Sequence, residues 1–246
     1  MQLIEQIGKY FLLMKRVFRR PEKFSILYHH TMREIQKTGI NSFSIVVIIS
    51  LFVGAVITIQ ANYNIENPFL PKYLIGVMVR DSLLLEFSST MVALILAGKV
   101  GSSIASELGM MRVTEQIDAL EVMGINSSSY LIFPKVIATV LFFPILCLLS
   151  VIVGLVGGYL SCVLGNVIPP SEFIEGIQYG FRPYYISYAL TKTALYAFII
   201  TSVSSYFGYF VVGGAVEVGK SSTRAVVQSS ILILLANLIL TRTILQ

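Results

Sequence analysis

The sequence predicts an all-α integral membrane protein, with an amphipathic N-terminal helix at the membrane interface followed by five transmembrane helices. Of the 246 residues, 55% are hydrophobic and only 13% are Asp, Glu, Lys or Arg, whereas soluble domains carry roughly 25% charged residues. Four long runs contain no charged residue, namely 41–65, 136–171, 193–216 and 225–241. A helix needs about 20 apolar residues to cross a bilayer. These observations exclude a soluble globule, a disordered chain and a basic domain that binds nucleic acid.

Residues 1–20 predict an amphipathic helix rather than a signal peptide. Apolar residues recur at helical spacing from Leu3 through Met14 to Phe18, and basic residues occupy the positions between them. A signal peptide would need a continuous apolar core and a small-residue cleavage site. We therefore expect residues 1–40 to form an interfacial helix on an anionic membrane surface, followed by a connector.

The rest of the chain, residues 41–246, predicts a membrane domain of five spans. They fall near residues 42–62, 83–103, 132–163, 186–211 and 224–245. The second span belongs to a longer apolar stretch, 73–104, whose start we expect in or above the interface. Asn67-Pro68 and Pro169-Pro170 mark turns between spans. In the third span, the pair Gly154 and Gly158 predicts a close approach of another helix.

The distribution of lysine and arginine predicts the orientation. If the N-terminus is cytoplasmic, most of the 18 Lys and Arg residues fall on the cytoplasmic side, as the positive-inside rule requires. Five spans then place the C-terminus on the opposite side of the membrane.

The residue spacings predict no disulfide and no metal site. Cys147 and Cys162 occupy one apolar run, and fifteen residues of helix would separate them by about 22 Å, which exceeds disulfide reach. The histidines and cysteines do not have the spacing of metal ligands.

Residues 214–221 read G-A-V-E-V-G-K-S, which formally matches a phosphate-binding P-loop. A P-loop must follow a buried strand and open a helix inside an α/β domain, and no such domain fits this chain. We therefore expect a cytoplasmic loop whose spacing matches by chance.

A polar segment, about residues 107–124, separates the second and third spans on the predicted cytoplasmic side. From Met110 to Gly124, apolar residues recur at helical spacing and acidic residues occupy the other side. Because acidic residues disfavour adsorption to an anionic leaflet, we expect a short amphipathic helix that docks a soluble partner. The alternative is a helix that lies passively on the interface.

Two charged residues, Glu86 and Lys192, fall inside predicted spans, each roughly one to two helical turns from the outer edge. Charges within a membrane are costly and usually functional. Opposite charges at matching depth could line a polar site for the headgroup of an amphiphile. Equally, the two residues could form a structural ion pair, or Lys192 could extend to the membrane surface.

Residues 96–138 carry a motif that resembles the MlaE/YrbE family of ABC-transporter permeases, which pair with MCE proteins. The residues that match the family pattern are Ala97-Gly98-Lys99, Gly101-Ser102, Glu107, Gly109, Met111, Thr114-Glu115-Gln116, Glu121, Met123 and Pro134-Lys135. A second block, Gly208-Tyr209 with residues 222–230, resembles the family's last loop and span. The resemblance covers nearly all of the chain from about residue 40.

The resemblance implies a homodimeric permease subunit without catalytic chemistry, cofactor or metal. Cytoplasmic ABC ATPase subunits would hydrolyse ATP, and a periplasmic MCE-domain protein would sit above the dimer. The complex would move phospholipid between the bacterial inner membrane and the MCE protein and so maintain the lipid asymmetry of the outer membrane. Nucleic acid is not an expected partner.

The resemblance also implies roles for particular residues. Glu86 and Lys192 match positions that line the family's lipid pocket. The segment that would couple to the ATPase contains Glu107, Arg112, Glu115, Gln116, Asp118 and Glu121. The chain departs from the family around Glu86, where relatives usually read R-E-L-G-P. Here Leu85-Glu86-Phe87-Ser88-Ser89 lacks both the arginine and the proline.

Two other classes of function remain open at the level of the residues. One is an ion-coupled secondary transporter in which Glu86 carries a proton. The other is a structural membrane scaffold, which would be indifferent to changes in a pocket. The acidic segment 107–124 favours the ATPase-coupled permease, because a proton carrier has no obvious need for it.

Overall fold

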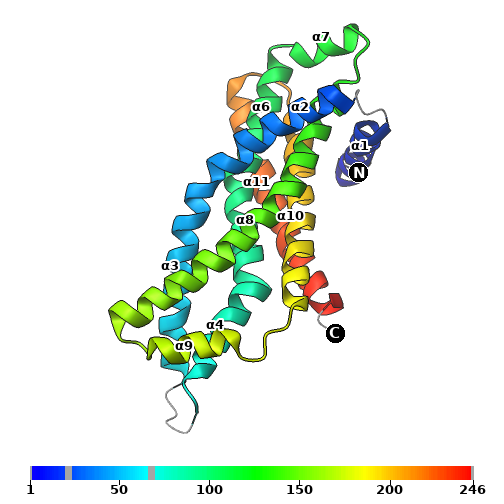
Figure 1. Ribbon diagram of the computed structural model, residues 1–246. Coiled ribbons are helices and arrows are strands. Elements are labelled where there is room, and N and C mark those ends of the chain that lie inside the picture. Colours follow the sequence, from blue (N-terminus) through cyan, green and yellow to red (C-terminus); the bar gives the residue numbers. More distant parts are fainter. Residues whose placement is uncertain (1, 20–23, 66–69, 245–246) are drawn as a thin grey trace. The chain divides into compact units, whose positions relative to one another are not determined.

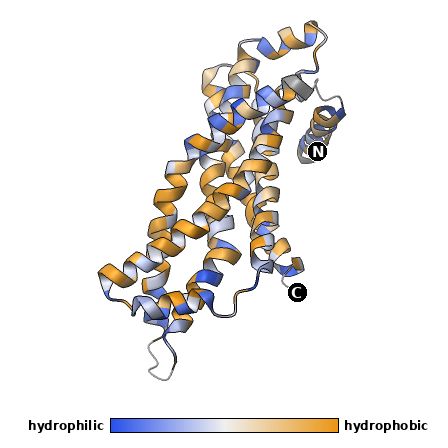
Figure 2. Cartoon of the chain, in the orientation of Figure 1, coloured by the Kyte–Doolittle hydropathy of each residue, from blue (hydrophilic) through white to orange (hydrophobic). Residues whose placement is uncertain are grey.

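The computed structural model describes residues 2–19, 24–65 and 70–244, and these ranges contain helices and turns but no strand (Figure 1). Five helical segments are long and apolar enough to cross a membrane: 27–64, 73–113, 127–165, 184–209 and 215–244. Apolar residues dominate most of their length (Figure 2). The predicted all-α membrane fold is therefore confirmed. The turn expected at Asn67-Pro68 lies outside the described residues.

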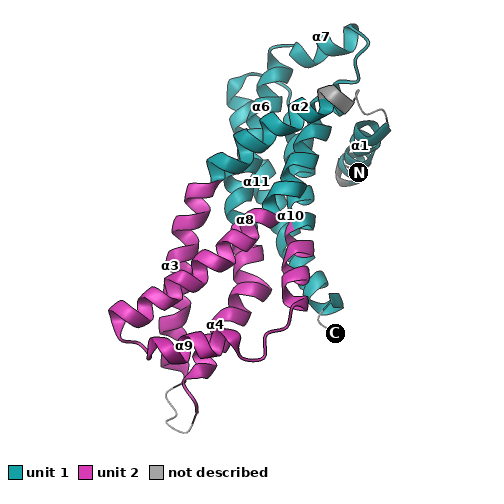
Figure 3. Ribbon diagram, in the orientation of Figure 1, with its two compact units in different colours: residues 1–42, 93–143, 194–246 teal, residues 43–92, 144–193 magenta. Residues whose placement is uncertain are grey.

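The helices follow one another with few long loops. In chain order they are α1 (Gln2–Arg19), α2 (Phe24–Glu34), η1 (Ile35–Ile40), α3 (Asn41–Asn64), α4 (Tyr73–Ser82), η2 (Leu83–Met91), α5 (Val92–Leu96), η3 (Ala97–Gly101), α6 (Ser102–Val113), α7 (Gln116–Val122), α8 (Ser127–Gly165), α9 (Pro170–Gln178), α10 (Tyr184–Tyr209) and α11 (Ala215–Ile244). The segments named η are π-helical, with wider turns than an α-helix. The helices divide into two compact units: unit 1 comprises residues 1–42, 93–143 and 194–246, and unit 2 comprises residues 43–92 and 144–193 (Figure 3).

In unit 2, helix packing depends on small residues. A side chain at Gly54 on α3 would collide with the backbone of Gly154 on α8, and one at Gly157 would collide with the backbone of Leu51. The Ser50 hydroxyl donates to that of Ser150 at 2.8 Å in the same contact. The close helix approach predicted from the glycines of the third span is confirmed.

Unit 1 holds the N-terminal helix and the segment between the second and third spans. α6 packs against α11. α1 buries Leu13 and Val17 but exposes Ile4 and Phe11. The hydroxyl of Tyr10 donates to Ser202 on α10 at 2.8 Å. The N-terminal helix is thus anchored to the bundle while one apolar side remains uncovered.

The loop predicted for residues 214–221 is wrong, because α11 already begins at Ala215. Glu217 lies in the first turn, where a carboxylate interacts favourably with the helix dipole. Its carboxylate also lies 2.5 Å from the ammonium of Lys220, three residues along the helix. These charged residues therefore start the helix instead of forming a loop. Within the described ranges no strand precedes the motif, so the context that a P-loop requires is missing.

Candidate functional site

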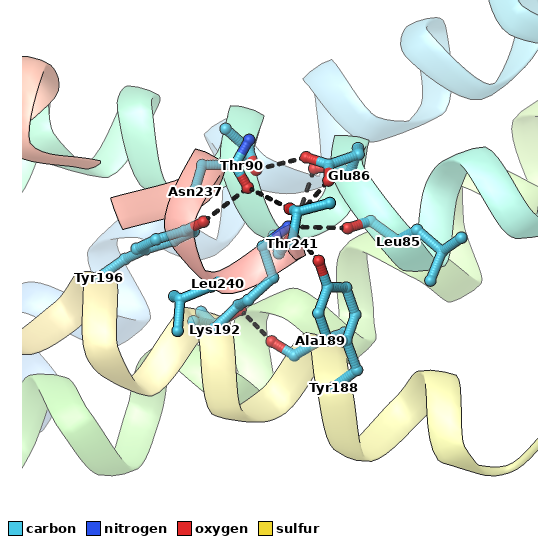
Figure 4. Close-up of polar contacts among 12 residues, drawn as sticks. Leu85, Glu86, Thr90, Tyr188, Ala189, Lys192, Tyr196, Asn237, Leu240 and Thr241 are labelled. Carbon is cyan, nitrogen blue, oxygen red and sulfur yellow. Dashed lines mark hydrogen bonds and ion pairs between the residues drawn. The ribbon is translucent and has the colours of Figure 1, made fainter. Parts of the chain in front are cut away.

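Lys192 on α10 and Glu86 on η2 form an ion pair within unit 2 (Figure 4). The lysine Nζ lies 3.0 Å from Glu86 Oε1. It also donates to the main-chain oxygen of Leu85 at 3.1 Å and to the hydroxyl of Tyr188 at 2.9 Å. Among the alternatives left open by the sequence, extension of Lys192 to the membrane surface is therefore wrong in this structure.

The two charges differ in their access to the surroundings. The side chain of Lys192 is fully buried, whereas that of Glu86 is 40% exposed. The Tyr188 ring adds a cation–π contact, with its centroid 4.7 Å from Nζ. The second carboxylate oxygen of Glu86 accepts a hydrogen bond from Thr90 at 3.3 Å. The ammonium is thus held by protein oxygens, and its charged partner lies on the accessible side. Chemically, this arrangement can accept an anion in exchange for the carboxylate.

The helical backbone around Glu86 is irregular. Residues 83–91 form the π-helix η2, which carries Glu86 and Thr90 on widened turns. Wide turns of this kind occur frequently at functional sites. Glu86 therefore lies in an irregular helical stretch that contains no proline.

The single amphipathic helix predicted for Met110 to Gly124 is wrong. α6 ends at Val113, and α7 begins anew at Gln116. Between them, the Thr114 hydroxyl bonds back to the Met110 carbonyl at 2.8 Å. Glu115 has a left-handed backbone with φ 58°, which few residues other than glycine adopt. The helical periodicity continues across this break, so it could not be recognised from spacing.

The six residues predicted to couple to an ATPase fall into three groups. Glu115 and Gln116 are exposed at the start of α7. Arg112 and Asp118 form an ion pair at 2.5 Å across the break. Glu107 and Glu121 bond to other helices of unit 1, as described below.

α7 presents apolar surface as well as charge. Ile117 is fully buried and anchors the helix, whereas Val122 and Met123 are 89% and 66% exposed. Methionine is enriched at protein–protein interfaces, so this exposed apolar end of the segment is a candidate docking surface for another protein.

Glu121 connects α7 to the helices that follow it. Its Oε1 lies 2.9 Å from the hydroxyls of both Ser127 and Tyr209. Hydrogen bonds from Ser127 and Tyr209 lower the pKa of this carboxyl below its usual value. Because the pKa is lowered in the folded state, ionised Glu121 stabilises the fold at neutral pH, and this contribution is lost as the pH falls through the folded-state pKa.

Glu121→Gln should therefore lower the thermal unfolding midpoint at pH 7, and the difference from wild type should narrow as the pH falls through the lowered folded-state pKa of Glu121, where the carboxyl becomes neutral. The measurement is thermal unfolding in detergent across this pH range. Glu115→Gln, which removes an exposed carboxylate of the same segment, is the matched control. If the unfolding midpoints of Glu121→Gln and wild type differ by the same amount at every pH, this role of the carboxylate is contradicted.

Several contributors to the site were missed from the sequence. Tyr188 lies one helical turn before Lys192 on α10, a spacing that could have identified it. Thr90 likewise lies four residues from its partner, following Glu86 in the sequence. The main-chain oxygen of Leu85 carries no signal in the sequence. Among the described residues, no group of three or more His, Cys, Asp or Glu side chains is arranged to hold a metal ion.

Comparison with known proteins gives consistent matches over most of the chain. The family model described as Permease MlaE matches residues 31–243. A probable ABC transporter permease protein of Rickettsia bellii is 36% identical over 244 residues, covering 98% of this chain and 92% of its own. The chloroplastic protein TRIGALACTOSYLDIACYLGLYCEROL 1 of Arabidopsis thaliana is 32% identical, covering 93% of this chain and 65% of its own. The intermembrane phospholipid transport system permease protein MlaE of Haemophilus influenzae is 29% identical, covering 85% of this chain and 80% of its own.

Proposed function

The chain belongs to the MlaE permease family of ABC transporters, and from that premise we propose that it is the membrane subunit of an ATP-driven phospholipid transporter. The relative from Haemophilus influenzae is named for intermembrane phospholipid transport, which supports phospholipid as the cargo. The observation that carries the proposal is the buried ammonium of Lys192 beside the half-exposed carboxylate of Glu86. A lipid phosphate is an anion of the kind that such a site would accept.

The site would work by exchange of partners. In the empty state the carboxylate of Glu86 neutralises Lys192. When a phospholipid enters, its phosphate takes the place of the carboxylate and accepts hydrogen bonds from the ammonium as a point charge. The displaced carboxylate stays hydrated, because it already lies on the accessible side. The acyl chains would lie in an apolar cavity between two copies of the chain.

The energy would come from partner subunits. Two cytoplasmic ABC ATPases would bind the surface formed by Glu115, Gln116, Val122 and Met123. Their closure on ATP would move α7 as a rigid body and open or close the lipid cavity. The permease itself would catalyse no reaction. This function requires the N-terminus and α7 in the cytoplasm.

Beyond the membrane, the homodimer would hand lipid to or receive it from a periplasmic MCE-domain protein, and so maintain lipid asymmetry of the outer membrane. We place the complex in the bacterial inner membrane, with the C-terminus periplasmic. The exposed apolar residues Ile4 and Phe11 of α1 suit an interfacial helix. Residues 1–40 would then anchor and lead into the permease body, residues 41–246.

The test is purification of the chain together with the subunits that bind it, followed by reconstitution of the complex into vesicles. We expect ATPase subunits to co-purify, phospholipid to be identified in the preparation by mass spectrometry, and lipid transfer to require ATP hydrolysis. Transfer that proceeds without ATPase and stops when a proton gradient is collapsed would instead identify an ion-coupled transporter. Absence of bound lipid and of transfer would identify a scaffold.

A further inference from the structure

A second buried lysine, Lys135 on α8, lies at the centre of an ion cluster in unit 1. Its side chain is 4% exposed. The Nζ donates to Glu34 Oε1 at 2.7 Å and to Glu107 Oε2 at 2.8 Å. The same oxygen of Glu107 lies 2.8 Å from the Nζ of Lys37. We call these four residues the Lys135 cluster.

The Lys135 cluster joins three parts of the chain that flank the ATPase-docking segment. Glu107 lies on α6, which leads into α7, and Lys135 lies on α8, which follows α7. Glu34 ends α2, and Lys37 lies in η1, which runs directly into α3. One ammonium therefore ties both flanks of α7 to the helix that continues as the first span.

The contact between these parts is stiff. Removing one partner of a buried ion pair leaves an uncompensated charge, so the partners resist separation. Two residues after Lys37, a side chain at Gly39 would collide with the ring of Phe142 on α8. η1 is thus tied to α6 by the ion pair of Lys37 with Glu107, and it packs closely against α8 at Gly39.

The helix geometry and the packing around the Lys135 cluster leave room for movement. η1 is π-helical, and wide turns of this kind inside a longer helix occur frequently at functional sites. A cavity of about 380 Å³ borders the cluster and is lined by its four residues, by a further cation, Arg33, and by neighbours such as His30 and Tyr130. The charged side chains therefore have space to shift as the helices move.

The cluster changes the assignment of Glu107. The family motif placed this residue with those that couple to the ATPase, and its carboxylate is bonded to two lysines of the same chain. The segment's exposed residues, Glu115 and Gln116, are available to a partner, whereas Glu107 acts on the inner side of the segment.

From these contacts we propose that Lys135 is a positioning residue that transmits the movement of α7 to α3 through Glu107, Glu34 and η1. This inference rests on the proposed function, since it presupposes that an ATPase moves α7. It adds that the permease transmits this movement through a defined buried cation.

The experiment compares Lys135→Met with wild type in the co-purified permease–ATPase complex reconstituted in phospholipid vesicles. Both ATP hydrolysis and lipid transfer are measured, and their ratio is the readout. We expect ATP hydrolysis to persist, while lipid moved per ATP falls by about 3- to 30-fold, the range of coupling changes caused by mutations within such networks. Lys135→Arg, which keeps a cation between the two carboxylates, should restore the ratio.

Lys220→Met is the matched control, because Lys220 forms an exposed ion pair on α11 outside the cluster, and it should leave the ratio unchanged. If Lys135→Met does not assemble, Glu107→Gln gives the same test, since Lys135 then retains Glu34. An unchanged ratio in an assembled cluster variant overturns the inference while the proposed function stands. A wild-type complex that hydrolyses ATP without moving lipid overturns the proposed function, and with it this inference.

Discussion

Lys192→Met should reduce ATP-dependent lipid transfer by about 10-fold or more, because a hydrogen bond to a charged group such as a lipid phosphate contributes about 1.5–3 kcal/mol. Methionine fills the volume of the lysine stem but offers nothing to a phosphate. The carboxylate of Glu86 is 40% exposed and retains its bond from Thr90, so it keeps a hydrogen-bond partner after the change. The complex should therefore still assemble, and the loss should appear in transfer measured on reconstituted vesicles.

Substituting the other member of the pair, Glu86, distinguishes an effect on lipid binding from an effect on folding. Glu86→Gln leaves a fully buried ammonium without its carboxylate, which is the costlier way to break such a pair. We expect this variant to lower the thermal unfolding midpoint more than Lys192→Met does. Replacing Lys192 by glutamate would be a poorer probe, because two carboxylates would then face each other in a buried site. Transfer at the wild-type rate by Lys192→Met would rule out the phosphate role.

Gly54→Ala should destabilise the protein by about 1–3 kcal/mol or more, the usual cost of overpacking a tight contact. The added methyl group would overlap the carbonyl of Gly154 on α8, and a backbone atom cannot turn aside as a flexible side chain can. The two helices must therefore separate, which also strains the hydrogen bond between Ser50 and Ser150.

The control for this prediction is Gly219→Ala on α11, where nothing lies within 4 Å of the added group. Alanine favours a helix over glycine by about 1 kcal/mol, so the control should be neutral or stabilising. Thermal unfolding in detergent measures both variants. Equal midpoints for the two alanine variants would show that α3 and α8 are not in backbone contact.

The sequence was most informative where a single physical constraint dominates. Spans of uncharged residues predicted the long helices because a charge inside a bilayer is costly. The same reasoning drew attention to Glu86 and Lys192, and the structure brings their charged groups together. It failed for residues 214–221, because charged residues in the first turns of a helix look like a loop when only hydropathy is considered.

Features that depend on local backbone geometry or distant partners could not be predicted. The break between α6 and α7 depends on the left-handed backbone of Glu115, and the helical pattern runs through it without interruption. The contact between Lys135 and Glu34 joins residues 101 positions apart. Nothing in the sequence around either residue identifies its partner, so the cluster can be recognised only in the folded chain.

The bond from Lys192 to residue 85 uses a main-chain oxygen, and every amino acid possesses that atom. Evolution can therefore exchange the side chain at position 85 freely without removing this acceptor, and comparing residue types among relatives will not reveal it. What the acceptor depends on is the count of residues in the wide turns of η2. Inserting or deleting a single amino acid there would rotate the oxygen away from the amine, so this contact depends on the length of the stretch rather than on the side chain at position 85.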